Sequence, residues 1–291
     1  MKYLVQHTTV YRYSEPASLG HNQARLTPRS FGRQRCLSSQ VAIEPEPTAR
    51  ADWDDYYGNR VSYFTIEREH ARLTVTARSE VELDSSAYVD PAGTLDWEQA
   101  RARLAHPCDP DTIAAAPFLY DSPHVQQQPW LGEYAAGSFT SGRPLLEALL
   151  DLTRRIHREF RYTPASTCVS TPVREVFERR CGVCQDFAHL QIGCLRSLGL
   201  AARYVSGYLL TDPPPGSPRL VGADASHAWL SVYCPGAGWL DVDPTNNQMP
   251  DLRHVTVAWG RDYSDVCPVK GVVLGGGQHG MSVAVDVSPL G

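Results

Sequence analysis

The stretch that decides the fold is Cys181-Gly182-Val183-Cys184-Gln185-Asp186-Phe187-Ala188-His189-Leu190. From Cys184 onward the apolar residues recur at helical spacing, which predicts an amphipathic helix that starts at Cys184 and ends before Gly199. The predicted inward stripe consists of Cys184, Phe187, Ala188, Ile192, Leu195 and Leu198. A helix N-terminus favours negative charge and therefore lowers the pKa of a thiol there, so Cys184 is a candidate nucleophile. The alternative is a cysteine that only fills the core.

A second stretch further along the chain predicts a β-hairpin. Residues 225–233 and 239–243 are rich in β-branched and aromatic side chains, and the turn residues of 234–238 lie between them. Pro244 ends the second strand. A turn centred on Pro235 would set the register of the two strands.

In that register His227 lies opposite Asp243, close enough for a carboxylate to hold an imidazole. Asp241 lies on the same face of its strand as Asp243 and is the alternative carboxylate. Together with Cys184, the hairpin would supply a nucleophile, a base and a residue that orients the base.

Several motifs, in the same order along the chain, resemble the bacterial transglutaminase-like superfamily. They are Phe160-Arg161-Tyr162, the stretches 182–189 and 198–208, Ser226-His227-Ala228-Trp229, Gly238-Trp239 and Asp243-Pro244-Thr245-Asn246, flanked by Tyr57-Gly58-Asn59 and by 261–266. The resemblance covers most of the chain and is weakest between about residues 85 and 141.

The resemblance implies an α+β fold: a papain-like transglutaminase core of helices and an antiparallel sheet, with an N-terminal antiparallel β-domain. It also implies a catalytic triad with Cys184 as the nucleophile, His227 as the base and Asp243 as its partner.

Patterning along the chain predicts four segments. Residues 1–84 read as a β-sandwich-like domain, because short strand patterns alternate with turn residues. Residues 85–141 are expected to be a linker or a flap that could cover part of the cleft, with one short helix. Residues 142–270 would form the catalytic core. The clean alternation within 271–291 predicts a C-terminal strand that returns to the N-terminal sheet.

Other residues near the motifs are candidates for supporting roles. The backbone N–H of Cys184 is the first candidate donor to an oxyanion, and the Tyr162 hydroxyl is the second. Asp186 can accept backbone N–H bonds at the helix start. Trp229 either shields the His–Asp pair or fills the core. His189 is rotated by about 140° from Cys184 around the helix, so a structural role is favoured.

Cys181 and Cys184 form a Cys-x-x-Cys motif, but no second ligand pair accompanies it. We therefore expect no metal and no cofactor. Oxidation of Cys181 with Cys184 is a hypothesis for a switch that turns activity off.

Composition narrows the class of protein. The chain has 291 residues, of which 42% are hydrophobic and 20% charged, which is typical of a soluble globular protein. A net charge of -5 argues against a nucleic-acid partner. No stretch is long and apolar enough for a signal peptide or a membrane span, and the eight cysteines are scattered, so a cytoplasmic protein is expected. The family resemblance implies a bacterial one.

These features predict cysteine-dependent acyl transfer on a peptide or protein amide through a thioester. Hydrolysis of the peptidase or amidase type is slightly favoured, since a general cross-linker would be hazardous in the cytoplasm. One alternative is a protein-glutamine gamma-glutamyltransferase that uses an amine acceptor for cross-linking, or deamidates. Another is a non-catalytic binding module on the same fold.

Overall fold

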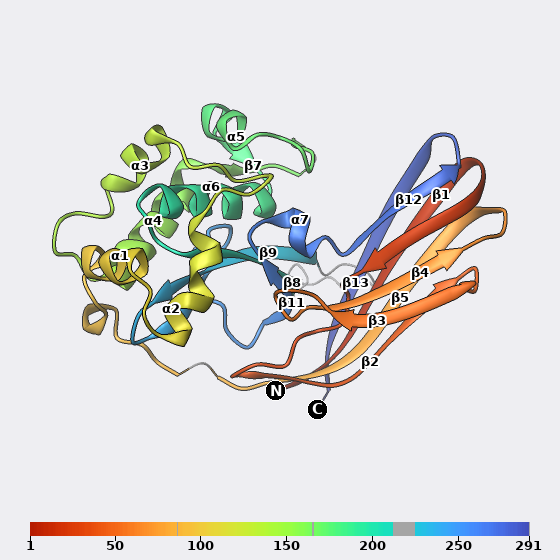
Figure 1. The fold of residues 1–291 in the computed structure, drawn as a ribbon, viewed down its shortest axis with the longest axis horizontal. Helices are drawn as coiled ribbons and strands as arrows, with labels where there is room; N and C mark the ends of the chain where they lie inside the picture. The colour runs from red at the N-terminus through yellow and green to blue at the C-terminus, as the bar shows by residue number, and fades with distance from the viewer. Residues whose placement is uncertain (86, 165, 212–224, 291) are drawn as a thin grey trace, which may run out of the picture.

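The structure is a computed structural model that describes residues 1–85, 87–164, 166–211 and 225–290. Helices surround a small sheet on the left of Figure 1, and a long twisted sheet extends to the right. No helix in the described ranges is long and apolar enough to cross a lipid bilayer.

The long sheet is built from strands at both ends of the chain. Its seven strands are β1 (Lys2–Ala24), β2 (Gln34–Glu44), β3 (Ala49–Asp54), β4 (Arg60–Ile66), β5 (His70–Leu83), β12 (Val269–Gly275) and β13 (His279–Leu290). The first half of β1 pairs with β5 and β13, and its second half pairs with β4 and β12. Apolar residues of β1, β2, β4, β5 and β12 share one buried cluster, so this sheet has a hydrophobic core of its own.

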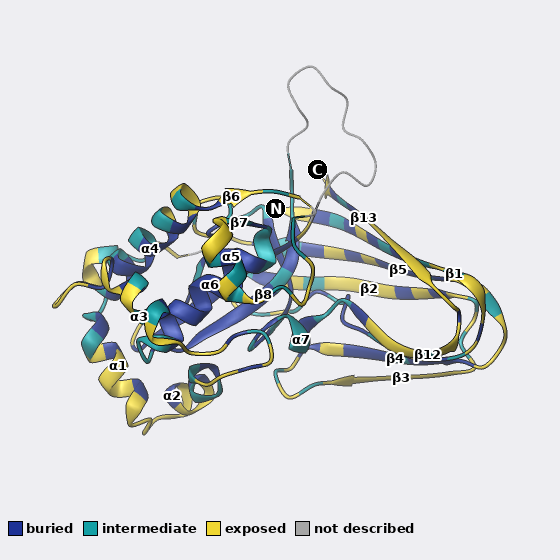
Figure 2. Cartoon of the chain, turned by 90° about the horizontal axis from the view of Figure 1, so that it is seen from above, coloured by how far each residue is buried: buried dark blue, intermediate teal, exposed yellow. Residues whose placement is uncertain are grey.

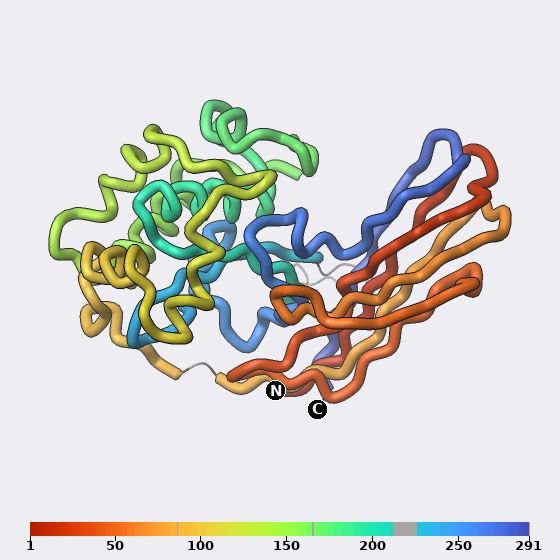
Figure 3. The backbone as a smooth tube through the Cα atoms, viewed as in Figure 1, coloured from red at the N-terminus to blue at the C-terminus, as the bar shows by residue number. Residues whose placement is uncertain are grey.

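The C-terminal tail returns to this sheet. β13 runs antiparallel to β1, from Lys2 opposite Leu290 to Tyr13 opposite His279. The two termini therefore lie close together at one end of the sheet (Figure 3). The predicted α+β fold with an N-terminal β-domain is confirmed, and that β-domain includes the C-terminal strands.

The core has a four-stranded antiparallel sheet in the order β10-β9-β8-β11. The strands are β8 (Ala202–Leu209), β9 (Ala225–Cys234), β10 (Gly238–Val242) and β11 (His254–Gly260). The helices are α1 (Trp97–Ala105), α2 (Pro110–Ala115), α3 (Pro129–Ala136), α4 (Leu145–Glu159), α5 (Val173–Arg179), α6 (Cys184–Ser197) and α7 (Tyr263–Val266), with 3-10 turns η1 (Pro91–Gly93) and η2 (Ala116–Leu119). The short strands β6 (Arg161–Tyr162) and β7 (Cys181–Gly182) pair in parallel.

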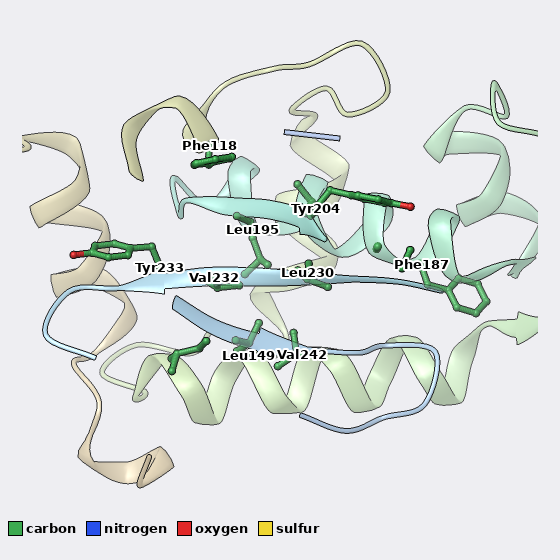
Figure 4. Packing of buried hydrophobic residues seen from close by; sticks show 14 of the residues in the cluster. Phe118, Leu149, Phe187, Leu195, Tyr204, Leu230, Val232, Tyr233 and Val242 are labelled. Carbon is green, nitrogen blue, oxygen red and sulfur yellow. The ribbon is translucent and has the colours of Figure 1, made fainter. Parts of the chain in front are cut away.

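Helix α6 is the centre of the core. It packs against β8 and β9, and α3, α4 and α5 also contact it. All eleven residues from Asp186 to Arg196 are buried, and Figure 2 shows the helix almost entirely dark blue. In Figure 4 Leu195 lies close to Val232 of β9, while Leu149 of α4 lies beside Val242 of β10. The predicted helix is present, but the prediction of one buried stripe is wrong in extent, because neighbours pack on every side of α6.

Residues 85–141 differ from the linker or flap that the sequence suggested. The described residues of this segment form η1, α1, α2, η2 and α3, and Leu104, Phe118, Leu131 and Phe139 join the main hydrophobic cluster. Their frequent prolines start short helices at the first turn, as in α2 and α3. Pro-rich sequence here therefore indicated closely spaced helix starts rather than an unstructured connection.

Two side-chain amides of the N-terminal domain cover the outer edge of the core sheet. Gln34 Nε2 donates to the Thr256 carbonyl at 2.7 Å, and the Thr256 N–H donates to Gln34 Oε1 at 2.8 Å. Asn59 repeats the pattern on Trp259, with Nδ2 to carbonyl at 2.9 Å and N–H to Oδ1 at 3.0 Å. Because β11 is the last strand of its sheet, these amides satisfy backbone groups that another strand would otherwise bond.

Gln34→Ala should destabilise the protein by about 2 kcal/mol, since it leaves the buried N–H and carbonyl of Thr256 without those partners. Urea unfolding should show a lower midpoint at an unchanged slope. Gln40→Ala, at an exposed position of the same strand, is the matched control. Equal midpoints for the two variants would contradict this role of Gln34.

Candidate active site

The start of α6 is fixed by a small network around Cys184, the first residue of the helix. Asp186 Oδ2 accepts the Val183 N–H at 2.8 Å and the Thr167 hydroxyl at 2.6 Å. A Cβ at Gly182 would lie 2.7 Å from the same carboxylate oxygen, so only glycine leaves room for this bond. The motif thus positions the thiol, and leaves the Cys184 backbone N–H without a partner inside its own helix.

His227 and Asp243 are joined by a 2.7 Å hydrogen bond between Nε2 and Oδ2. The hairpin register differs from the predicted one: Cys234 pairs with Gly238, so the turn is centred on Gly236 rather than Pro235. Asp243 consequently lies diagonally across from His227 instead of directly opposite. The two side chains still meet because a shift of this size keeps them on the same face of the sheet.

The segment after β10 holds Asp243 in place. Its Oδ1 accepts the backbone N–H groups of Thr245 at 2.9 Å and Asn246 at 3.2 Å, which closes a tight turn. Its Oδ2 also accepts a bond from Asn246 Nδ2 at 2.7 Å. The sequence motif identified Asn246 but gave it no role; in the structure the residue is a direct partner of the carboxylate.

His254 is a neighbour of the pair that the sequence did not reveal. It is fully buried, and its Nε2 lies 3.3 Å from Asp243 Oδ2. Its Nδ1 accepts the Asp251 N–H at 3.4 Å, so Nε2 is the ring nitrogen that donates to Asp243. The sequence around His254 does not indicate this role, because the contact with Asp243 depends on how β11 lies in the sheet.

The site's electrostatics favour a charged imidazole. Burial alone would lower the pKa of His227, but the hydrogen bonds with Asp243 and with the Cys184 side chain outweigh it and raise this pKa to about 10. Burial would raise the pKa of Asp243, but bonds from His227 and His254 hold it well below its usual range. Because Nε2 of His227 is held by Asp243, Nδ1 is the ring nitrogen left to face the sulfur.

Cys184 and His227 open onto one cavity of about 380 Å³. Its lining comprises His7, Thr9, Tyr11, Val183, Cys184, Gln185, Tyr204, Ser206, Ser226, His227, Ala228, Tyr263, Pro268, Val269, Met281, Val283 and Val285. No described residue of 85–141 is among them, so the described part of the expected flap does not border this cavity. The lining instead includes β1 and β13 of the long sheet, which the sequence did not predict.

Three more candidates from the sequence are Tyr162, Trp229 and Asp241. Tyr162 is half exposed and does not line the cavity, although burial and the nearby Cys184 raise its pKa. Trp229 is fully buried, with its ring centre 6.0 Å from that of His227. Asp241 bonds to Ser231 across the hairpin and not to His227.

Two further candidates from the sequence lie away from the cavity lining. His189 stacks on His124 at 5.5 Å, and burial lowers its pKa to about 3. Cys181 is a free thiol in β7. Its oxidation with Cys184 stays a prediction.

Among the described residues, His227, Asp243 and His254 have ligand-type atoms within 4.8 Å of one another. Nε2 of each histidine is already hydrogen-bonded to Asp243 Oδ2. A cation here would have to replace the bonds that orient His227.

Residues 3–82 match the family model of the bacterial transglutaminase-like N-terminal region, and residues 133–244 match that of the transglutaminase-like superfamily. An uncharacterized protein of Mycobacterium bovis is 43% identical over 99% of this chain and 93% of its own length. The chain belongs to the bacterial transglutaminase-like superfamily. The resemblance drawn from the sequence motifs is therefore confirmed.

A crystal structure from Cytophaga hutchinsonii, described as that of a proposed cysteine protease, has the same fold as this superfamily member. Its TM-score is 0.77 at 21% identity, over 99% of this chain and 90% of that one. A protein-glutamine gamma-glutamyltransferase of Pseudomonas aeruginosa is 36% identical over 110 residues, which are 37% of this chain and 16% of that protein.

We expect His227 to stay protonated at neutral pH and to lose its proton only as the pH rises toward about 10. The pKa of His227 in the folded protein lies above its value of about 6.5 in the unfolded chain, so protonation of His227 stabilises the fold fully below a pH of about 6.5. This stabilisation is lost as the pH rises through about 10. The imidazole nitrogen shifts in NMR measure the titration. Cys184→Ala should lower the midpoint, whereas Cys181→Ala should not. A wild-type midpoint near 6.5 would contradict the proposed network.

Proposed function

We propose that this superfamily member is an enzyme that transfers acyl groups from amide bonds through a thioester on Cys184. The observation that carries the proposal is that His227 hydrogen-bonds to both the Cys184 side chain and Asp243, with sulfur and imidazole at one cavity. A nucleophile, a base and an orienting acid in that order are the recurring parts of acyl transfer.

The reaction would proceed in two steps. The Cys184 thiolate attacks the amide carbonyl carbon, and the C–S bond forms. As the C–N bond breaks, the His227 imidazolium gives its proton to the leaving amine. Water then attacks the thioester while His227 takes a proton, so a C–O bond forms, the C–S bond breaks and the thiolate returns. Asp243 stays ionised throughout and keeps the ring in the productive orientation.

An oxyanion would be stabilised first by the backbone N–H of Cys184, which lies in the first turn of α6. The positive end of the helix dipole adds to this donor. Tyr162 is a weaker candidate for the second donor, because it lies outside the lining of the cavity.

Hydrolysis is favoured over transfer to a lysine amine. No Asp or Glu is among the described residues that line the cavity, so nothing there attracts a protonated amine. The partial match to the Pseudomonas glutamyltransferase supports the alternative, in which an amine in place of water resolves the thioester. A non-catalytic binding module would need none of the hydrogen bonds that hold His227.

The test incubates the protein with peptides that contain glutamine, with and without a primary amine, and weighs the products. We expect hydrolysed or deamidated peptide, and little amine adduct. Cys184→Ala and His227→Ala should each reduce the rate by at least about 10³-fold, because the two residues act as a unit. Cys181→Ala is the matched thiol control and should retain activity.

Dominant amine adducts would establish the glutamyltransferase alternative. No turnover of any peptide, together with an iodoacetamide rate at Cys184 that does not respond to His227→Ala, would establish the binding module.

A further inference from the structure

One wall of the catalytic cavity belongs to the long sheet. Its members are three cross-strand pairs of β1 and β13, namely His7 with Val285, Thr9 with Val283 and Tyr11 with Met281. Residues two apart in a strand point to the same face, so all six side chains lie on one side of the sheet. We call this surface the β1–β13 wall.

The wall changes from buried to exposed along β13. Val285 is 1% exposed, Val283 45% and Met281 60%. Large apolar side chains are therefore left uncovered in the described structure where the wall leaves the cavity. None of the seventeen described lining residues is Asp, Glu, Lys or Arg. The charged ring of His227 is already paired with Asp243 and Cys184. A charged group from a substrate would therefore lose water at the wall without gaining a partner there, which is unfavourable.

His7 provides a polar contact in this wall. It is 1% exposed, and its Nε2 bonds to the Thr9 hydroxyl at 2.8 Å. Its Nδ1 is buried and has no hydrogen-bond partner among the described residues. Burial lowers the pKa of His7 to about 4, so the ring is neutral at neutral pH. His7 therefore adds no charge to the buried end of the wall.

We propose that the β1–β13 wall binds the acyl donor, and that this donor is an uncharged, apolar segment of polypeptide next to the reacting amide. Val283 and Met281 pack against its side chains. The inference rests on the proposed function for the role of Cys184, and adds to it the class of substrate. The wall continues directly from the catalytic cavity, which favours the donor chain over an unrelated partner.

The experiment uses short acetylated peptides that carry an iodoacetamide group and differ in one neighbouring side chain: Leu, Glu or Lys. Intact mass follows alkylation of Cys184, and the concentration dependence gives an inhibition constant for each peptide. Wild-type protein should bind the Leu peptide at least about tenfold more tightly than the other two, as burial of one leucine side chain would give.

Met281→Glu should shift the preference toward the Lys peptide by about tenfold and weaken binding of the Glu peptide. Leu274→Glu is the matched control, since Leu274 is a 56% exposed apolar residue of the same sheet outside the cavity lining. It should leave the order of the three peptides unchanged.

Three outcomes would overturn the inference. They are equal binding of the three peptides by wild-type protein, equal effects of Met281→Glu and Leu274→Glu, or a change in sedimentation but not in peptide preference with Met281→Glu, which would make the wall an interface between copies. Alkylation needs only a reactive thiol. If the predicted preferences appear but no amide is turned over, the wall stands and the proposed function fails.

Discussion

The arrangement of the site depends on a carboxylate that remains charged inside the protein. Asp243 is 0% exposed and accepts hydrogen bonds from five donors: two backbone N–H groups, the Asn246 amide and the rings of His227 and His254. Burying an unpaired carboxylate would be strongly unfavourable, so this set of donors is what allows the charge to exist there. The charge in turn holds His227 in its charged form beside Cys184.

The hydrogen bonds that hold Asp243 connect the site to the N-terminal domain. His254 begins β11, and Thr256, two residues later, is bonded by Gln34 of β2. Asn59 bonds the same strand at Trp259. The N-terminal domain therefore fixes the position of the strand that carries one of the donors to Asp243. A loss of these side-chain amides would act on the site through β11, without any contact to the reacting groups.

The sequence predicted the parts of the site that are encoded locally. The start of α6 follows from a glycine, an acid and helical spacing within a few residues of Cys184, and the pairing of β13 follows from its strict alternation. The hairpin register was wrong because one residue in the choice of turn centre moves every pair. His254 and His7 were not identified, since each reaches the site through pairing between distant strands. Such contacts depend on the three-dimensional arrangement, and no short motif records them.

The catalytic residues and the β1–β13 wall differ in which relatives can be compared with this chain. His7 and Val285 on the β1–β13 wall lie almost a full chain length apart, and His7 is 177 residues before Cys184. A match of 110 residues, such as that with the Pseudomonas glutamyltransferase, cannot contain both His7 and Cys184. It can carry over the nucleophile and its partners but not the wall that would select the acyl donor. The Mycobacterium bovis protein, matched over 99% of this chain, covers both, so a shared substrate class is expected there first.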